Sequence, residues 1–248
     1  MTRLTYILAI LFLISSCSRN QTSNSEKEIL EPDEDYVSEQ IELSDQDFFE
    51  DTILERCDPK SLDLSKYQIF IDTTKNSEFY KNLKNWSASK WDIQSINVTL
   101  NAINKDLNFS KIELIDFPSQ FITLRKLNGQ FFLYDRCDGI DPRFEIRDTA
   151  FISYGPLESD AESISKLIFL TEKSIELELR SFQAKSNYSY SKLKIDKIQE
   201  FIYRLTYTNK TYHRIEYVTT IDGIEKFDLV VNHCPDRKSI EFEGFDKE

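Results

Sequence analysis

Apolar and polar side chains alternate through much of the second half of the chain, and this alternation limits the fold more than any other feature. The run 174–182 alternates aliphatic with mainly charged or polar residues, as expected of a strand with one face in a core and one in water. Similar runs recur near 199–208, 211–220 and 224–232. Asn128-Gly129 and Asp222-Gly223 lie between such runs and suit type I′ hairpin turns. Strands joined by short turns predict an antiparallel meander.

The whole pattern predicts a mainly all-β protein with short N-terminal helices. Helices are predicted at 47–57, where Asp47 is a candidate cap, and at 77–86. About ten to twelve strands are predicted, near 67–72, 92–100, 111–117, 121–127, 130–136, 143–153, 165–171, 174–182, 199–208, 211–220, 224–232 and 239–243. So many strands limit their open edges best as an up-and-down meander curled into a closed or nearly closed barrel. A two-sheet β-sandwich is the alternative.

The start of this meander is similar to a known family. A short helix followed by Ser89-Lys90-Trp91-Asp92-Ile93 and the later strands resembles the lipocalin or calycin type. In that family a short helix precedes a Trp-bearing first strand and an up-and-down barrel follows. The resemblance covers residues 89–243, with Ser89 in place of the glycine of the family's Gly-x-Trp. The stretches 129–141 and 230–245 also resemble exported lipoproteins of uncharacterised function.

The N-terminus has the pattern of an exported protein. Arg3 is the only charge in residues 1–16, residues 7–14 are apolar, and the chain turns polar from residue 15. A spanning helix needs about 20 apolar residues, so this segment predicts a signal peptide. The run Leu13-Ile14-Ser15-Ser16-Cys17 resembles the lipobox of bacterial lipoproteins, whose cysteine is diacylated before the preceding peptide is removed. That resemblance implies a membrane anchor on Cys17; the alternative is an ordinary signal peptide that leaves Cys17 as a free thiol.

Charge and composition divide the rest of the chain. Removal of residues 1–16 leaves 30 basic and 43 acidic side chains, a net charge of −13. Residues 18–47 hold ten of the acidic residues and two of the basic ones, so this segment carries −8. A polar, acidic segment of this kind is typical of a disordered tether. The predicted organisation is a signal peptide at 1–16, the anchor cysteine and tether at 17–47, and one β-rich domain at 48–248.

Three further cysteines allow one disulfide and one leftover thiol. Cys137 and Cys234 each follow a predicted strand, so we expect them to lie at the ends of neighbouring elements and to pair. Pairing of Cys57 with Cys137 and three free thiols are the alternatives. Export permits oxidation.

Residues that can hold a metal are few. The two histidines are His213 and His233, and His233-Cys234 with Cys137 forms only a partial zinc set without supporting spacing. Asp135, Asp138 and Asp141 do not match a calcium loop, so a solvated turn is expected. We predict no metal and no cofactor.

No nucleophile elbow, phosphate loop or dinucleotide fingerprint occurs in the sequence. The chain has no strongly basic patch, which argues against nucleic-acid binding. Phe201, Tyr203 and Tyr207 share strand parity, and His213 is expected to point inward with Ile215 and Tyr217. These four residues are candidates for lining a ligand site.

The leading hypothesis is a non-enzymatic protein, lipid-anchored in the bacterial envelope. Because Ser18 follows the cysteine, the outer membrane is expected, with the protein on its periplasmic or surface side. It would bind a small apolar ligand or a protein partner. One alternative is an interaction protein with a filled core that acts through exposed strand edges or loops. The other is an exported hydrolase of unrecognised type.

Overall fold

A computed structural model describes residues 54–104, 111–183, 187–235 and 241–247. These residues belong to a compact unit that spans Ser44–Glu248. They form twelve strands, two α-helices and two short 3-10 helices within the described ranges. The signal peptide, Cys17 and the tether lie outside the described residues.

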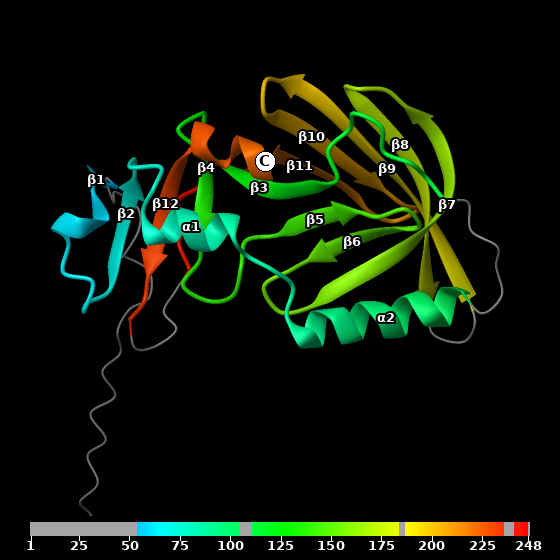
Figure 1. The fold of residues 1–248 in the computed structure, drawn as a ribbon, viewed down its shortest axis with the longest axis horizontal. Helices are drawn as coiled ribbons and strands as arrows, with labels where there is room; N and C mark the ends of the chain where they lie inside the picture. The colour runs from blue at the N-terminus through cyan, green and yellow to red at the C-terminus, as the bar shows by residue number, and fades with distance from the viewer. Residues whose placement is uncertain (1–53, 105–110, 184–186, 236–240, 248) are drawn as a thin grey trace, which may run out of the picture. The chain divides into compact units, whose positions relative to one another are not determined.

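Eight antiparallel strands close into a barrel (Figure 1). From β5 to β11 each strand pairs with the next, and β3 closes the ring by pairing with both β5 and β11. The predicted up-and-down barrel is confirmed, and the two-sheet sandwich is not formed. The strands are β3 (Gln120–Leu127), β5 (Arg143–Ile146), β6 (Ala150–Tyr154), β7 (Ser159–Leu170), β8 (Ser174–Gln183), β9 (Asn187–Gln199), β10 (Ile202–Thr208) and β11 (His213–Thr220).

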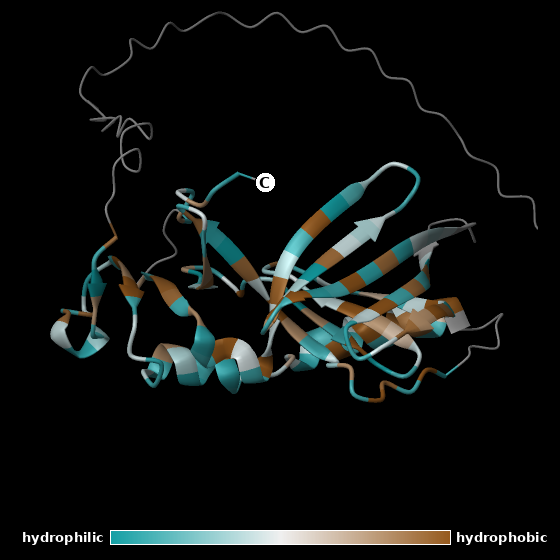
Figure 2. Cartoon of the chain, turned by 90° about the horizontal axis from the view of Figure 1, so that it is seen from above, coloured by the Kyte–Doolittle hydropathy of each residue, from teal (hydrophilic) through white to brown (hydrophobic). Residues whose placement is uncertain are grey.

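Alternation along these strands explains why the sheet curls. Hydrophobic and hydrophilic segments follow one another along the long strands (Figure 2). Ile175, Leu177 and Leu179 of β8 are fully buried, while the residues between them are partly exposed. The buried faces of all eight strands meet inside the ring, so closing the barrel removes the apolar surface from water.

Four short strands extend the sheet beyond the barrel. β4 (Gln130–Asp135) pairs with β3 through Asn128-Gly129, whose φ angles of 53° and 75° confirm the predicted type I′ turn. β12 (Asp228–His233) lies parallel to β4 and antiparallel to β2 (Gln68–Asp72), and β1 (Arg56–Cys57) pairs with β2. The extension therefore joins the two ends of the described chain.

The predicted strand at 92–100 is wrong, because residues Lys90–Asn104 form the helix α2. Ser89 and Asp92 make reciprocal side chain to backbone hydrogen bonds of 3.2 and 2.8 Å, which start the helix as a capping box does. Ile96 and Leu100 then pack against β6 and β7 with helical spacing. Trp91 is 78% exposed in the first turn of α2, so this part of the chain contains no Trp-bearing strand.

The helix predicted at 77–86 is confirmed as α1 (Glu78–Lys84), with Ser77 capping the Tyr80 N–H. The helix predicted at 47–57 is wrong at its end, where Arg56–Cys57 is β1, and its first residues lie outside the described residues. Strands are also not formed at 111–117, or in the described part of 239–243. The run 143–153 is the β5–β6 hairpin rather than one strand.

The predicted Asp222-Gly223 hairpin is also wrong. A 3-10 helix, Ile221–Lys226, separates β11 from β12, which pair with different strands. Gly223 does not have a positive φ. A Cβ there would lie 2.2 Å from the Thr219 hydroxyl, so the glycine serves a close approach and not a type I′ turn.

Candidate functional site

The barrel interior is packed with side chains from every strand of the ring. Tyr203 belongs to this packing, with its ring centroid 5.4 Å from that of Phe121 and 6.2 Å from that of Phe117. The buried members of the cluster are Ile112, Phe117, Phe121, Phe144, Ile146, Phe151, Ile164, Ile175, Leu177, Leu179, Leu193, Ile195, Tyr203, Leu205 and Val218. These residues form an apolar core inside the ring.

One buried carboxylate interrupts this core. The Glu162 Oε1 atom accepts hydrogen bonds from the hydroxyls of Ser181 (2.5 Å), Ser191 (2.8 Å) and Tyr207 (3.0 Å). Burial raises the pKa of Glu162, and the three hydroxyl hydrogen bonds oppose that shift. Tyr207 is therefore directed into the barrel, toward a polar partner.

The four predicted ligand-facing residues do not gather around one space. Tyr203 and Tyr207 point into the barrel, whereas Phe201 lies in the β9–β10 turn with φ 61° and packs on a different apolar cluster. His213 is exposed, with its Nδ1 atom 3.0 Å from the Thr208 hydroxyl oxygen. The prediction that His213 points inward is wrong.

The parity of β11 explains this error. Val218 is buried in the barrel core, and Arg214 and Glu216 share its face, with the Arg214 guanidinium 5.8 Å from the Phe144 ring centroid. The opposite face carries Tyr217, whose ring lies 5.0 Å from Phe131 in the cluster outside the barrel. Both faces of β11 are partly covered, so apolar residues occur on the outer face and charges on the inner face.

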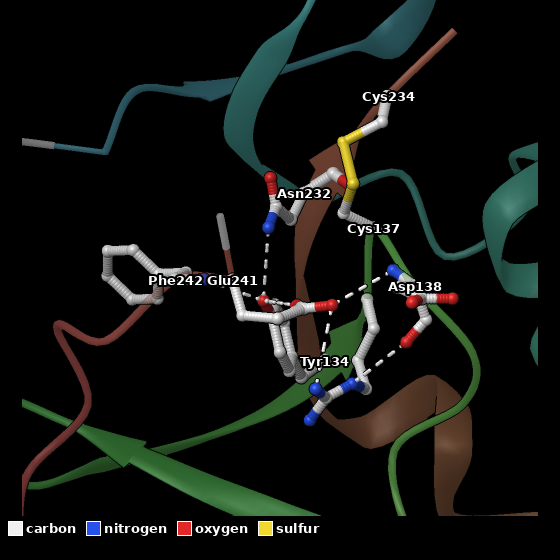
Figure 3. The surroundings of a disulfide bond; sticks show 8 residues. Tyr134, Cys137, Asp138, Asn232, Cys234, Glu241 and Phe242 are labelled. Atoms are coloured by element: carbon white, nitrogen blue, oxygen red, sulfur yellow. Dashed lines mark hydrogen bonds and ion pairs between the residues drawn. A yellow bond between two sulfur atoms is a disulfide. The ribbon is translucent and has the colours of Figure 1, made fainter. Parts of the chain in front are cut away.

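The structure contains the disulfide between Cys137 and Cys234 (Figure 3). Cys57 is a free, half-buried thiol. The bond joins the segments that follow β4 and β12, which are parallel neighbours. Beside it, Tyr134 donates to Glu241 at 2.6 Å and accepts from the Asn232 amide at 3.3 Å. Because both sulfurs are oxidised, the partial zinc set with His233 is not available.

The prediction of a solvated turn at Asp135, Asp138 and Asp141 is wrong, because Asp141 is buried and the other two are partly buried. Asp141 is buried and accepts hydrogen bonds from Arg125, and the Asp138 N–H donates to Glu241 at 2.9 Å. Burial raises the pKa of Asp135 to about 6. Within the described ranges, no three His, Cys, Asp or Glu side chains are placed to hold a metal ion.

A different feature emerges where two barrel strands separate. The β3–β11 ladder covers only Leu124–Phe121 of β3 against Tyr217–Thr220 of β11. Beyond it, residues 125–127 pair with β4 and residues 213–216 pair with β10 (Figure 1). We call the space between these two diverging ends the β3–β11 slot.

Backbone groups of β11 are open along this slot. The Asn209 N–H donates to the Tyr212 carbonyl across the β10–β11 turn, at 2.9 Å. Because backbone groups point to alternate sides along a strand, His213 and Ile215 direct their N–H and C=O groups away from β10. No strand pairs with them there within the described chain. Among the described residues, this part of β11 is therefore a strand edge without a pairing strand.

Two grooves of about 230 and 540 Å³ meet at the slot, and both are lined by Lys126, Arg214, Ile215, Tyr217 and Asp246. The Lys126 ammonium lies 4.2 Å from the Tyr217 ring centroid and has no carboxylate partner in the described ranges. Ile215 is 40% exposed. The slot thus offers an apolar side chain, an aromatic ring and a cation next to open backbone groups.

The inner side of the slot is held by two ion pairs. Arg125 binds the buried Asp141 through two nitrogens, and Arg214 pairs with Glu216. Burial raises the pKa of Glu216, opposed by Arg214 and Arg125, and its Oε2 atom has no hydrogen-bond partner in the described chain. The Arg125–Asp141 pair ties β3 to the segment before β5, whereas the Arg214–Glu216 pair lies within β11.

Sequence reasoning missed the slot because its residues have no motif. Arg125, Lys126 and Arg214 come from strands that are far apart in sequence and separate only in the folded sheet. The available signal was the charged pair Arg214 and Glu216 on the face of β11 that Val218 shares.

None of the family models, curated proteins or solved structures compared with the chain matches it. In the part of the chain that is described, neither α-helix has the length and apolar content needed to span a bilayer.

Proposed function

We propose that this protein is a lipid-anchored, non-enzymatic interaction protein of the bacterial envelope, which captures an extended segment of a partner protein in the β3–β11 slot. Its anchor is the diacylated Cys17, and the residue after it favours the outer membrane. The observation that carries the proposal is the open backbone edge of His213 and Ile215, because such an edge accepts an added strand.

The positions of the candidate ligand-facing residues favour this function over capture of an apolar ligand. Ligand pockets of typical size enclose about 300–1,000 Å³ of mostly apolar space. The aromatic residues that were candidates for such a pocket instead pack against core side chains or hydrogen-bond to Glu162. The slot lies at the surface, where a partner has access.

The chain's own C-terminal segment indicates what kind of occupant suits the slot. The Asp246 N–H donates to the Lys126 carbonyl at 2.8 Å, on the side of β3 that faces the slot. The Asp246 carboxylate accepts the Asn128 and Gly129 N–H groups at 2.9 and 2.8 Å. Main-chain hydrogen bonding from a separate segment is therefore already used on the β3 edge, while the β11 edge stays open.

Site-specific photocrosslinking tests this function. A benzophenone amino acid replaces Ile215 in the full-length protein in its native membranes. Ile168 of β7 and Ile198 of β9 are matched controls, because each is an isoleucine that is 40% exposed. A discrete protein adduct at position 215 that is absent at 168 and 198 supports the proposal. Equal adducts at all three positions, or none at 215, contradict it.

A further inference from the structure

A second cavity lies on the outer wall of the barrel and is independent of the slot. It has a volume of about 250 Å³ and lies between strands β3, β5 and β6 and the segment that joins α1 to α2. Its lining includes Trp86, Gln120, Arg143, Glu145, Arg147 and Tyr154. Cations and aromatic rings therefore surround a small space.

Arg143 is the unusual residue of this cavity. Only 5% of its surface is exposed, yet no carboxylate of the described chain lies within ion-pair distance of it. Its Nη2 atom donates to the Leu83 carbonyl at 2.8 Å, and its Nε atom is buried without a partner. A buried guanidinium with so few partners is costly.

The Nη1 group of Arg143 is the donor that remains available. It has no hydrogen-bond partner among the described residues. Unlike the Nε atom, it is not fully enclosed by protein. Since Arg143 lines the cavity, the little surface that it keeps belongs there. Burial lowers the pKa of Arg143 to about 10, so the group stays cationic at neutral pH.

Aromatic rings complete the wall around this cation. The guanidinium carbon lies 4.7 Å from the Trp86 ring centroid, and the Trp86 ring packs edge-on against Tyr154 at 5.0 Å. A guanidinium held over an aromatic ring is suited to bind a planar anion.

The other charges at the cavity are already paired. Arg147 binds Glu145 at 3.0 Å, and Lys84 binds Glu225 at 3.0 Å. Asp135 and Asp141 act on Arg143 electrostatically but make no ion pair with it, so its guanidinium can still pair with a monoanion. A dianion would bring an excess negative charge close to Glu145.

We propose that this cavity binds a small monocarboxylate with a flat apolar body, through a hydrogen-bonded ion pair with Arg143 and contact with Trp86. A space of about 250 Å³ equals roughly eight water molecules of liquid volume. It therefore suits a single-ring acid better than a lipid.

Two-dimensional NMR of the ¹⁵N-labelled full-length protein tests this site, with benzoate as the probe. The chain has two tryptophans, so the spectrum has two indole N–H signals. Benzoate at millimolar concentration should shift the Trp86 signal saturably. Trp91, exposed on α2, serves as the internal control and should not respond. Benzamide has the same ring without the charge and should not bind.

Arg143→Gln should weaken benzoate binding by about tenfold or more. Arg180→Gln is the matched control, because Arg180 also stacks on a ring, that of Tyr190, and does not line this cavity. Should Arg143→Gln fail to fold, Arg143→Lys, which keeps the charge without the planar fork, should weaken binding as well. No saturable shift of Trp86, equal binding of benzamide, or unchanged affinity in the folded Arg143 variant would overturn the proposal.

Discussion

Loss of the Cys137–Cys234 disulfide should strongly destabilise the protein without changing its native fold. The two cysteines are 97 positions apart, and the chain between them contains every barrel strand except β3. In the chain-entropy model a closed loop of this length lowers the entropy of the unfolded chain by the equivalent of about 4.7 kcal/mol at 25 °C. The folded state loses little, because β4 and β12 remain paired through their own ladder.

Urea unfolding, followed by tryptophan fluorescence, measures this effect. With a slope of about 2.5 kcal/mol per molar urea, Cys137→Ser/Cys234→Ser should lower the midpoint by about 2 M. Reduction of the wild type should give the same shift, and Cys57→Ser should give almost none because Cys57 is a free thiol. An unchanged midpoint in the double variant, or an equal shift in Cys57→Ser, would refute the reasoning.

Three other changes test separate parts of the structure. Ser89→Ala should destabilise the protein by about 1 kcal/mol in thermal or urea unfolding, because it removes the capping hydroxyl of α2; no loss would exclude the capping box. Glu162 has a raised pKa in the folded state. Its favourable contribution to the free energy of unfolding is therefore present at low pH and is lost as pH rises through that pKa. The unfolding free energy of Glu162→Gln relative to wild type should therefore increase between about pH 4 and pH 7, and a pH-independent difference would contradict the burial of an ionisable carboxyl. Cys17→Ser should abolish incorporation of radiolabelled fatty acid and release the protein from membranes, whereas complete retention in the membrane fraction would rule out the lipid anchor.

Much of the barrel could be predicted from sequence because its signal is local. The alternation in 174–182 is strong. Its two-residue period correctly predicts that Ile175, Leu177 and Leu179 are buried. The Asn128-Gly129 turn was equally clear, since both residues tolerate positive φ.

The failures have equally specific causes. Residues 92–100 contain β-branched side chains that favour a strand, but the Ser89 and Asp92 cap and the apolar spacing of Ile96 and Leu100 favour the helix that forms. β9 was missed because Lys192 and Lys194 flank the buried Leu193, and because the buried Ser191 interrupts the apolar residues on the inner face.

The candidate sites were beyond sequence reasoning for a different reason. The slot exists because the β3–β11 ladder ends after four pairs, and the Arg143 cavity exists because the segment after α1 crosses the barrel wall. Neither the end of this ladder nor the path of that segment changes the residue pattern of a single strand. The parity of β11 could have been assigned correctly only by allowing the paired Arg214 and Glu216 inside the barrel.

Amide hydrogen exchange at single-residue resolution tests the central claim, strand capture in the slot, most directly. In the purified protein, His213 and Ile215 should exchange quickly, while Arg214 and Glu216 should be protected by their hydrogen bonds to β10. In native membranes, where the partner is present, His213 and Ile215 should become protected as well. Equal exchange of His213 and Ile215 in both preparations, or protection of both in the purified protein, would contradict the claim that this edge is open and captures a partner strand.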